Sequence, residues 1–420
     1  MNYQKTETMT TQTPKLRFPE FPDSGNKSYK KQSFKDIFLF STGKNIKQNE
    51  ASPEFETPCV RYGELYHMYN EVIAEVINKT NLDKSELLFS DGDEILLPSA
   101  GEDPLDIGSA SALTVANVAI GRTINVLKPQ KVNIYHQIFV AYYINQKLRK
   151  KISTLAKGSS ISNVYNSDLK TLEITLPSFL EQTKIANFLT AIDEKIQALK
   201  QKKTLLEQYK KGIMQQIFSQ ELRFKNDDGS DFDDWEEKSL GEISNIKRGA
   251  SPRPISDKKW FSNISSIGWV RISDVTKSNK FLNKTEQYLS DEGVKKSRFL
   301  EKGNLIMSIC ATIGKPIYTN IPVCIHDGFV VFDDIQADRE YVYYYLDFIQ
   351  DKWYQYGQPG SQVNLNTEIV SNEIINFPSI SEQKKIANFL TAIDEKIEKA
   401  SQQITATETY KKGLLQQMFI

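Results

Sequence analysis

Two long stretches of the chain carry apolar residues at alternating steps of four and three positions. In the first stretch these are Ile185, Leu189, Ile192, Ile196, Leu199, Leu206 and Ile213; in the second they are Ile386, Leu390, Ile393, Ile397, Ala400, Ile404, Leu414 and Met418. This spacing forms one apolar stripe along a helix and is typical of a coiled-coil seam. Pro177 and Pro378 come just before the stretches, and no proline lies inside them. We therefore expect two helices of about 40 residues, each roughly 60 Å long.

The rest of the chain has a different sequence pattern, in which short runs of residues that favour β-strands are separated by Gly, Pro, Asn and Asp. Examples are Val115–Ile120, Leu305–Ile309 and Pro322–Ile325. This pattern predicts mixed α+β globules. The first 13 residues are polar and lack the apolar core of a signal peptide, so we expect a frayed tail. The sequence thus predicts five segments: a tail (1–13), a globule (14–176), a helix (177–219), a second globule (220–377) and a second helix (378–420).

The two helical stretches are copies of one another. Residues 177–218 and 378–419 align without gaps and share 27 of 42 positions, including KIANFLTAIDEKI at 184–196 and 385–397. Weaker matches follow in the same order through both globules: Leu16-Arg17-Phe18 with Leu222-Arg223-Phe224, Gly43 with Gly249, Val60-Arg61 with Val270-Arg271, Gly92–Ile95 with Gly303–Ile306, Ile120-Gly121-Arg122 with Ile313-Gly314-Lys315, and Gly158-Ser159 with Gly360-Ser361. The chain therefore contains an internal duplication of a unit of about 200 residues.

The two copies predict how the helices pack. The first seam carries Lys203 and Leu206 at the steps where the second carries Ile404 and Thr407. Each seam therefore has a polar residue where the other has an apolar one, so the two seams are expected to pack better on each other than each would on a copy of itself. The simplest assembly pairs the two helices within the chain. The alternative is that each helix packs on its own globule.

Composition narrows the class of protein. The 420 residues include 53 Lys and Arg against 53 Asp and Glu, so a uniformly basic DNA-coating protein is excluded while local basic surfaces are not. Cys59, Cys310 and Cys324 are irregularly spaced, which favours a reducing cytoplasm over a disulfide framework or a zinc site. No apolar run approaches the ~20 residues that span a bilayer.

The charges are segregated along the chain. Residues 107–167 contain no acid and eight bases, and residues 244–280 contain eight bases against Asp257 and Asp274. In both units these bases are mixed with Ser, Asn and aromatic residues, which include Tyr in the first stretch and Trp in the second, a combination that suits contacts to phosphates and base edges. The alternative is an ordinary solvated basic face. Its occurrence in both copies favours nucleic acid.

These features carry a resemblance to the specificity (S) subunit of type I restriction–modification systems, the HsdS family. The block Leu-Pro-Ser-x-x-Glu-Gln-x-Lys-Ile-Ala-Asn-Phe-Leu at 176–189, mirrored at 377–390, is similar to that family. So is the series Trp269-Val-Arg-Ile-Ser-Asp274, Lys302-Gly-Asn-Leu-Ile and Ala311-Thr-Ile-Gly-Lys315. The first globule departs from the series, with Cys59-Val-Arg-Tyr-Gly-Glu64 in place of the tryptophan motif, and is assigned by position and duplication.

The resemblance implies an α+β fold in which two target-recognition domains are joined by two long antiparallel coiled-coil helices, with a pseudo-twofold internal repeat. Each domain would read one half of a bipartite, asymmetric double-stranded DNA target. The helices would bind two methyltransferase (M) subunits, through which two restriction (R) subunits join. S-adenosylmethionine would be held by the M subunits and ATP with Mg²⁺ by the R subunits. The chain itself would be a non-catalytic cytoplasmic protein that binds no cofactor and no metal.

Loops rich in Arg, Lys, Asn, Gln and Ser supply the candidates for DNA contact, because Arg and Lys pair with guanine and Asn or Gln with adenine. They are Lys44, Asn45, Arg122, Lys157, Ser159, Ser160 and Asn163 in the first domain, and Arg248, Ser251, Arg253, Arg271, Lys315, Gln358, Ser361, Gln362 and Asn364 in the second. The Gly-Ser loops could equally be plain turns. Arg61 and Arg271 recur at equivalent places, which indicates a shared role, to phosphate or structural.

Catalytic motifs are missing from the sequence. There is no Asn/Asp-Pro-Pro-Tyr/Phe motif and no phosphate-binding loop, and we interpret His326-Asp327 as an ordinary strand end. Asp193-Glu194-Lys195 and its copy at 394–396 are expected on an exposed charged face or a partner surface. Glu181-Gln182 and Glu382-Gln383 would complement the helix dipole or contact an M subunit. The two Lys-Lys pairs, 210–211 and 411–412, are expected to be solvated. A coiled-coil adaptor that binds only proteins remains the alternative function.

Overall fold

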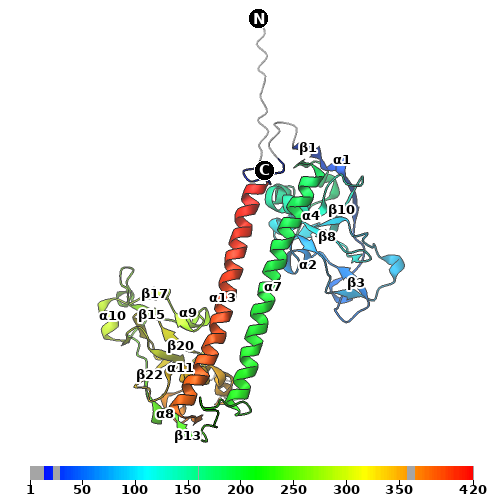
Figure 1. Cartoon of the computed structure of the whole chain (residues 1–420). Coiled ribbons are helices and arrows are strands. Elements are labelled where there is room, and N and C mark those ends of the chain that lie inside the picture. The colour runs from blue at the N-terminus through cyan, green and yellow to red at the C-terminus, as the bar shows by residue number, and fades with distance from the viewer. Residues whose placement is uncertain (1–13, 22–28, 159, 357–364, 420) are drawn as a thin grey trace. The chain divides into compact units, whose positions relative to one another are not determined.

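The computed structural model describes residues 14–21, 29–158, 160–356 and 365–419. Its contacts divide the chain into two compact units (Figure 1). Unit 1 comprises residues 1–200 together with 402–420, and unit 2 comprises residues 201–401. Each unit therefore contains one globule, the first half of the helix that follows it, and the last half of the other long helix.

Unit 1 is built around a five-stranded sheet of order β2-β10-β6-β8-β4. Its strands are β1 (Lys30–Ser33), β2 (Phe38–Thr42), β3 (Thr57–Val60), β4 (Val72–Ile73), β5 (Lys79–Thr80), β6 (Glu94–Pro98), β7 (Ala100–Gly101), β8 (Ser111–Leu113), β9 (Ala119–Ile120), β10 (Ile124–Pro129), β11 (Ser162–Asn163) and β12 (Glu173–Leu176). Its helices are α1 (Phe34–Ile37), α2 (Glu64–His67), α3 (Pro104–Ile107), α4 (Gln137–Tyr143), α5 (Arg149–Thr154), α6 (Asn166–Leu169) and the first half of α7 (Phe179–Phe218).

Unit 2 repeats this plan with a five-stranded sheet of order β14-β22-β19-β20-β16. Its strands are β13 (Glu236–Ser239), β14 (Asn245–Arg248), β15 (Gly268–Val270), β16 (Phe281–Leu282), β17 (Gln287–Tyr288), β18 (Arg298–Leu300), β19 (Leu305–Ser308), β20 (Pro316–Thr319), β21 (Val323–Ile325), β22 (Phe329–Asp333) and β23 (Ile374–Phe377). Its helices are α8 (Leu240–Ile243), α9 (Ile272–Thr276), α10 (Asp291–Lys295), α11 (Arg339–Phe348), α12 (Thr367–Ser371) and the first half of α13 (Ile380–Met418). The expected mixed α+β globules and internal repeat are confirmed.

Strand register corrects one of the sequence matches between the units. β3 pairs in parallel with β9 so that Val60 faces Ile120, and β15 pairs in parallel with β21 so that Val270 faces Ile325. The equivalent of Ile120 is therefore Ile325, and Gly121-Arg122 corresponds to His326-Asp327. The match to Ile313-Gly314-Lys315 was wrong because a three-residue pattern does not define a register. Gly314 lies between β19 and β20, in a different connection of the sheet.

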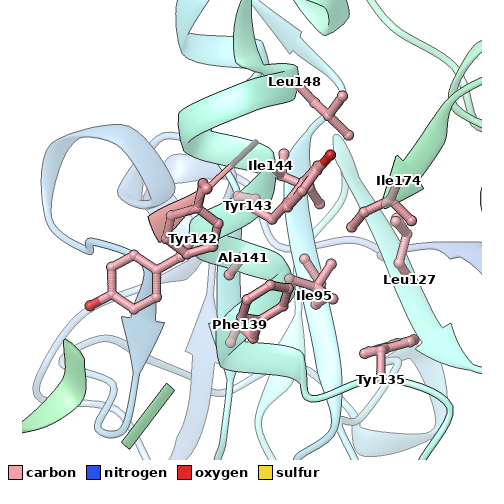
Figure 2. Packing of buried hydrophobic residues seen from close by; sticks show 14 of the residues in the cluster. Ile95, Leu127, Tyr135, Phe139, Ala141, Tyr142, Tyr143, Ile144, Leu148 and Ile174 are labelled. Carbon is pink, nitrogen blue, oxygen red and sulfur yellow. The ribbon is translucent and has the colours of Figure 1, made fainter. Parts of the chain in front are cut away.

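The two predicted long helices form as expected. Each packs on its own globule, and the end of the other long helix joins the same core. In unit 1 the seam residues Ile185, Leu189, Ile192 and Ile196 are buried in the core of their own globule, where Leu414 and Met418 of α13 join them. In unit 2 Ile386, Leu390 and Ile393 are buried in the same way, Ile397 packs partly buried against them, and Met214 and Ile217 of α7 join them. Figure 2 shows α4 of unit 1 packing its apolar side chains against Ile95, Leu127 and Ile174 of the strands.

A repeated ion pair joins the end of one long helix to the start of the other. Lys411 lies 2.6 Å from Asp193 and 5.0 Å from the ring centre of Tyr142, whose hydroxyl donates to Asp193. In unit 2 Lys210 lies 2.9 Å from Asp394 and 5.0 Å from the ring of Tyr344. Since these contacts pair the start of each helix with the end of the other, the helices run antiparallel within each unit.

These contacts correct two expectations. Lys210 and Lys411 are not solvated, because each side chain is only 15% exposed, whereas Lys211 and Lys412 are exposed as expected. Asp193 and Asp394 are likewise not part of an exposed charged face, while the acid and lysine that follow each of them are exposed. The sequence could not distinguish these neighbours, because the partners that bury one of each pair come from distant parts of the chain.

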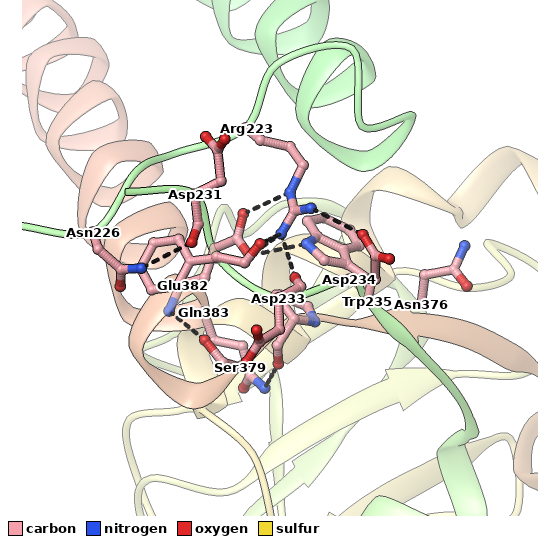
Figure 3. Close-up of polar contacts among 12 residues, drawn as sticks. Arg223, Asn226, Asp231, Asp233, Asp234, Trp235, Asn376, Ser379, Glu382 and Gln383 are labelled. Atoms are coloured by element: carbon pink, nitrogen blue, oxygen red, sulfur yellow. Dashed lines mark hydrogen bonds and ion pairs between the residues drawn. The ribbon is translucent and has the colours of Figure 1, made fainter. Parts of the chain in front are cut away.

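The repeated Glu-Gln pair at the start of each long helix is buried inside its unit. Glu382 accepts from the guanidinium of Arg223 at 2.9 Å and from the indole of Trp235 at 3.0 Å (Figure 3). Arg17 holds Glu181 in the same way at 2.7 Å. Gln383 accepts from the backbone of Asp338 and donates to Pro378. Both acids lie in the first helical turn, as the dipole interpretation requires, but their burial contradicts the alternative of contact with another subunit.

Within the part of the chain that the structure describes, no helix is both long enough and apolar enough to cross a membrane.

Candidate nucleic-acid interface

In both units the segment after the first strand of the main sheet (β2 or β14) lies against the turn that precedes the neighbouring strand of that sheet (β10 or β22). After β2, Gly43 donates to Ile124 and Lys44 donates to Ile120. After β14, Gly249 donates to Phe329 and Ala250 donates to Ile325 in the same pattern. A Cβ on either glycine would lie 2.0 Å from a backbone carbonyl oxygen, so only glycine lets the two segments approach this closely. We call this feature the crossing edge.

The crossing edge of unit 1 brings together three of the predicted DNA-contact residues. The backbone N–H of Arg122 donates to the carbonyl of Asn45 at 2.9 Å, directly beside Lys44. Asn45 has φ of +46° and its side-chain amide donates to the carbonyl of Glu86. The side chains of Lys44, Asn45 and Arg122 are all exposed. The edge therefore presents two cations and one amide, the groups that contact phosphates, guanine and adenine.

The crossing edge of unit 2 gathers Arg248, Ser251 and Arg253 around Asp327. The Ser251 hydroxyl donates to Oδ1 of Asp327 at 2.8 Å, and Nε of Arg248 donates to the Asp327 carbonyl at 2.7 Å. Arg253 lies 3.6 Å from Oδ2, and its side chain is 82% exposed. The hydrogen bond from Ser251 holds the pKa of Asp327 below its usual range, so the carboxylate is ionised at neutral pH.

Two further arginines border this edge. Arg298 donates to the carbonyl of Arg248, and Arg271 donates to the side chain of Gln287 at 2.8 Å. Between them lies His326, whose burial lowers its pKa to about 4. Its Nδ1 accepts from the backbone of Gly328 at 2.9 Å, which requires the neutral ring.

The recurrence of Arg61 and Arg271 has a local structural basis. The backbone N–H of Arg61 donates to Glu64, and that of Arg271 donates to Asp274 at the same place. In unit 2 Arg271 is the N-cap residue of α9 and Asp274 accepts its N–H, whereas in unit 1 Glu64 is the first residue of α2 and accepts the equivalent bond from the residue two before the N-cap; both carboxylates are buried. This favours the structural alternative for the shared backbone position.

The remaining candidates lie elsewhere. The Lys315 ammonium donates to the carbonyls of Thr276 and Ser278, and burial lowers its pKa. Lys157 and Asn163 exchange two backbone hydrogen bonds before α7, near the exposed Ser160, and the Lys157 ammonium pairs with Asp168 at 2.7 Å. Ser159, Gln358, Ser361, Gln362 and Asn364 lie outside the described residues.

Sequence reasoning missed Asp327 and Arg298. The sequence pattern predicts an ordinary strand-end side chain at Asp327, and Arg298 belongs to no motif. The match of Val60 with Val270 carries the missing signal, because the strand ending at Ile120 pairs with Val60 as the strand ending at Ile325 pairs with Val270.

Two copies of one α+β unit, each with a cationic crossing edge and a long helix, define a duplicated DNA-recognition scaffold. A family model described as "Type I restriction modification DNA specificity domain" matches residues 26–208 and 232–406. The chain therefore belongs to this family, and its two units carry the two recognition domains of a DNA specificity subunit. That subunit is the non-catalytic component of type I systems.

Individual relatives agree with this assignment. The type I restriction enzyme MjaVIII specificity subunit of Methanocaldococcus jannaschii is 23% identical over 370 residues, which is 83% of this chain and 82% of that protein. The fold is similar to that of the type I restriction–modification S subunit from M. genitalium, with a TM-score of 0.62, 17% identity, and coverage of 97% of this chain and 99% of that one. A structure from a study of type I complex assembly and conformational transition matches with a TM-score of 0.57 and 15% identity, over 94% and 98% of the two chains.

Proposed function

We propose that the chain recognises a bipartite, asymmetric DNA target, with one half-site read by each globule. The globules would correspond to residues 14–176 and 220–377, and the helical segments 177–219 and 378–420 would bind two M subunits, through which two R subunits join. S-adenosylmethionine would be bound by the M subunits and ATP with Mg²⁺ by the R subunits. The complex would act in the cytoplasm.

The observation that carries this proposal is the crossing edge. It occupies the same place in the two folds but presents different side chains: Lys44, Asn45 and Arg122 in unit 1, and Arg248, Ser251, Arg253 and Asp327 in unit 2. Equivalent positions with different hydrogen-bonding groups read different bases. An asymmetric target follows from one chain that carries two such edges.

A methylation map tests the proposal. Cells that express this chain with its M subunits should carry methylated adenine in a single split motif whose two halves differ. The chain alone should transfer no methyl group from S-adenosylmethionine. A contiguous palindromic motif, or methylation by the isolated chain, would contradict the proposal.

Arg253 gives a sharper test within unit 2. If its exposed guanidinium reads a base, Arg253→Ala should relax one position of one half-site, at a cost of about 1–3 kcal/mol for the original sequence. The exposed Lys302, in the turn before β19, supplies the control Lys302→Ala, which should leave the motif unchanged. Equal weakening on every sequence would instead assign Arg253 to a phosphate.

A further inference from the structure

A carboxylate stands at the crossing edge of unit 2 where unit 1 carries an arginine. Asp327 and Arg122 each lie two residues after paired strand residues, Ile325 and Ile120, which face Val270 and Val60 in the same parallel register. Lys44 and Ala250 make the equivalent backbone bonds to those strands. The side chains of Asp327 and Arg122 therefore occupy equivalent positions in the two folds.

We propose that Asp327 reads a base directly, by accepting a hydrogen bond from the exocyclic N4 amino group of cytosine in the second half-site. At the equivalent place Arg122 donates to guanine in the first half-site. This inference rests on the proposed function and adds the residue that reverses the hydrogen-bonding polarity between the two halves. In the major groove carboxylates accept from cytosine N4, and arginine donates to guanine O6 and N7.

The carboxylate of Asp327 is held in place and can still accept. Ser251 fixes Oδ1 at 2.8 Å, while Oδ2 is 3.6 Å from Arg253, beyond hydrogen-bond distance. The side chain is 43% exposed. Since a carboxylate offers about four acceptor positions, Oδ2 is available to an amino group that approaches from solvent.

The arginines around Asp327 explain how an acid can face a polyanion. Arg248, Arg271 and Arg298 each donate from Nε to a neutral oxygen, either a carbonyl or the amide of Gln287. These bonds do not cancel their charges, so with Arg253 four guanidinium groups accompany the Asp327 carboxylate at this edge. The positive surroundings favour phosphate contact while Asp327 supplies an acceptor for one base.

The competing role for Asp327 is to position Arg253, which alone would touch the base. The two roles differ in which position of the half-site each residue controls. A direct reader and Arg253 would govern different base pairs, whereas a positioning residue would govern the same base pair as Arg253.

The experiment uses the full chain assembled with its M subunit, and DNA in which the second half-site is randomised. Asp327→Asn keeps the shape but replaces one acceptor oxygen by a donor, and Asn pairs with adenine, so the preference for cytosine should fall roughly 10- to 100-fold at one position, with the first half-site unchanged. Asp333→Asn is the matched control, because Asp333 lies at the other end of β22 and pairs with Lys247. It should leave the motif intact.

An unchanged motif for Asp327→Asn overturns the inference, as does uniform weakening on all sequences. Relaxation at the same position as Arg253→Ala also overturns it and assigns Asp327 to positioning. If Asp327→Asn does not fold, Asp327→Glu replaces it: the moved carboxylate should keep the preference for cytosine with weaker discrimination, and unaltered discrimination counts against the inference. Failure of the proposed function is a separate result, since the wild-type complex would then show no split motif.

Discussion

At the scale of single residues, the repeated segments contain two acids that are buried and paired with an arginine, Glu181 and Glu382. Glu382 is fully buried and is satisfied by Arg223 and Trp235, and Glu181 with Arg17 repeats the arrangement in unit 1. The repeated Leu-Arg-Phe and Glu-Gln segments were visible in the sequence as separate matches. That they form one ion pair, 159 residues apart in the chain, was decided by the fold.

The first prediction concerns this pair. Arg223→Ala should lower the free energy of unfolding by about 3–5 kcal/mol, because it leaves the Glu382 carboxylate buried without its cation. The control is Asp234→Ala, which removes a fully exposed partner 3.8 Å from the same guanidinium and should change the free energy of unfolding far less, because water screens that pair. Urea denaturation followed by circular dichroism measures both. Similar costs for the two variants would contradict the buried-charge account.

The second prediction uses His326. Its pKa of about 4 in the fold lies below the usual 6.5, so the unfolded chain binds more protons between these values and unfolding becomes easier as the pH falls. From pH 7 to pH 5 this group should cost about 2 kcal/mol of stability.

A comparison with His326→Gln, which cannot titrate, isolates that contribution. Denaturation midpoints at both pH values should show a smaller pH dependence in the variant. An unaltered dependence in His326→Gln would mean that protonation of this ring does not oppose folding.

At the scale of elements, the long helices were predicted almost to the residue, since α7 spans Phe179–Phe218 and α13 spans Ile380–Met418. Their 3.5-residue apolar repeat is local information. The short strands were harder: the apolar run at Val115–Ile120 is a strand only over its last two residues, Ala119–Ile120. Such strands depend on partners distant in sequence, so local pattern fixes their ends poorly.

The third prediction separates two kinds of glycine. Gly212 lies inside α7, and a Cβ there would meet nothing within 4 Å, so Gly212→Ala should stabilise the chain by about 0.5–1 kcal/mol through helix propensity. Gly249→Ala, at the crossing edge, should destabilise it, because the new Cβ would lie 2.0 Å from the His326 carbonyl oxygen. Thermal unfolding should show opposite signs, and the same sign for both would refute the distinction.

At the scale of the whole molecule, each unit has its own core, and each core takes residues from both long helices. Leu414 and Met418 of α13 pack with the first globule, and Met214 and Ile217 of α7 pack with the second. The exchange of one globule should therefore succeed only if both helices are retained.

The fourth prediction follows from this. Replacing residues 14–160 with the corresponding segment of another specificity subunit should change one half of the methylated motif and leave the other half intact, because the crossing edge of unit 2 is untouched. A methylation map of cells carrying the chimaera with the M subunits measures this. A change in both halves would show that the two units do not read independently.

The sequence alone determined the duplicated unit, the two long helices, the α+β class of the globules and the segregation of basic residues. These depend on local periodicity, composition and self-similarity, which a single chain displays directly. Tertiary structure alone decided that Arg122 corresponds to Asp327, that Lys411 meets Asp193, and that Glu382 is buried. Each of these depends on strand register or on contacts between distant segments, and the packing of the folded chain, not local pattern, selects them.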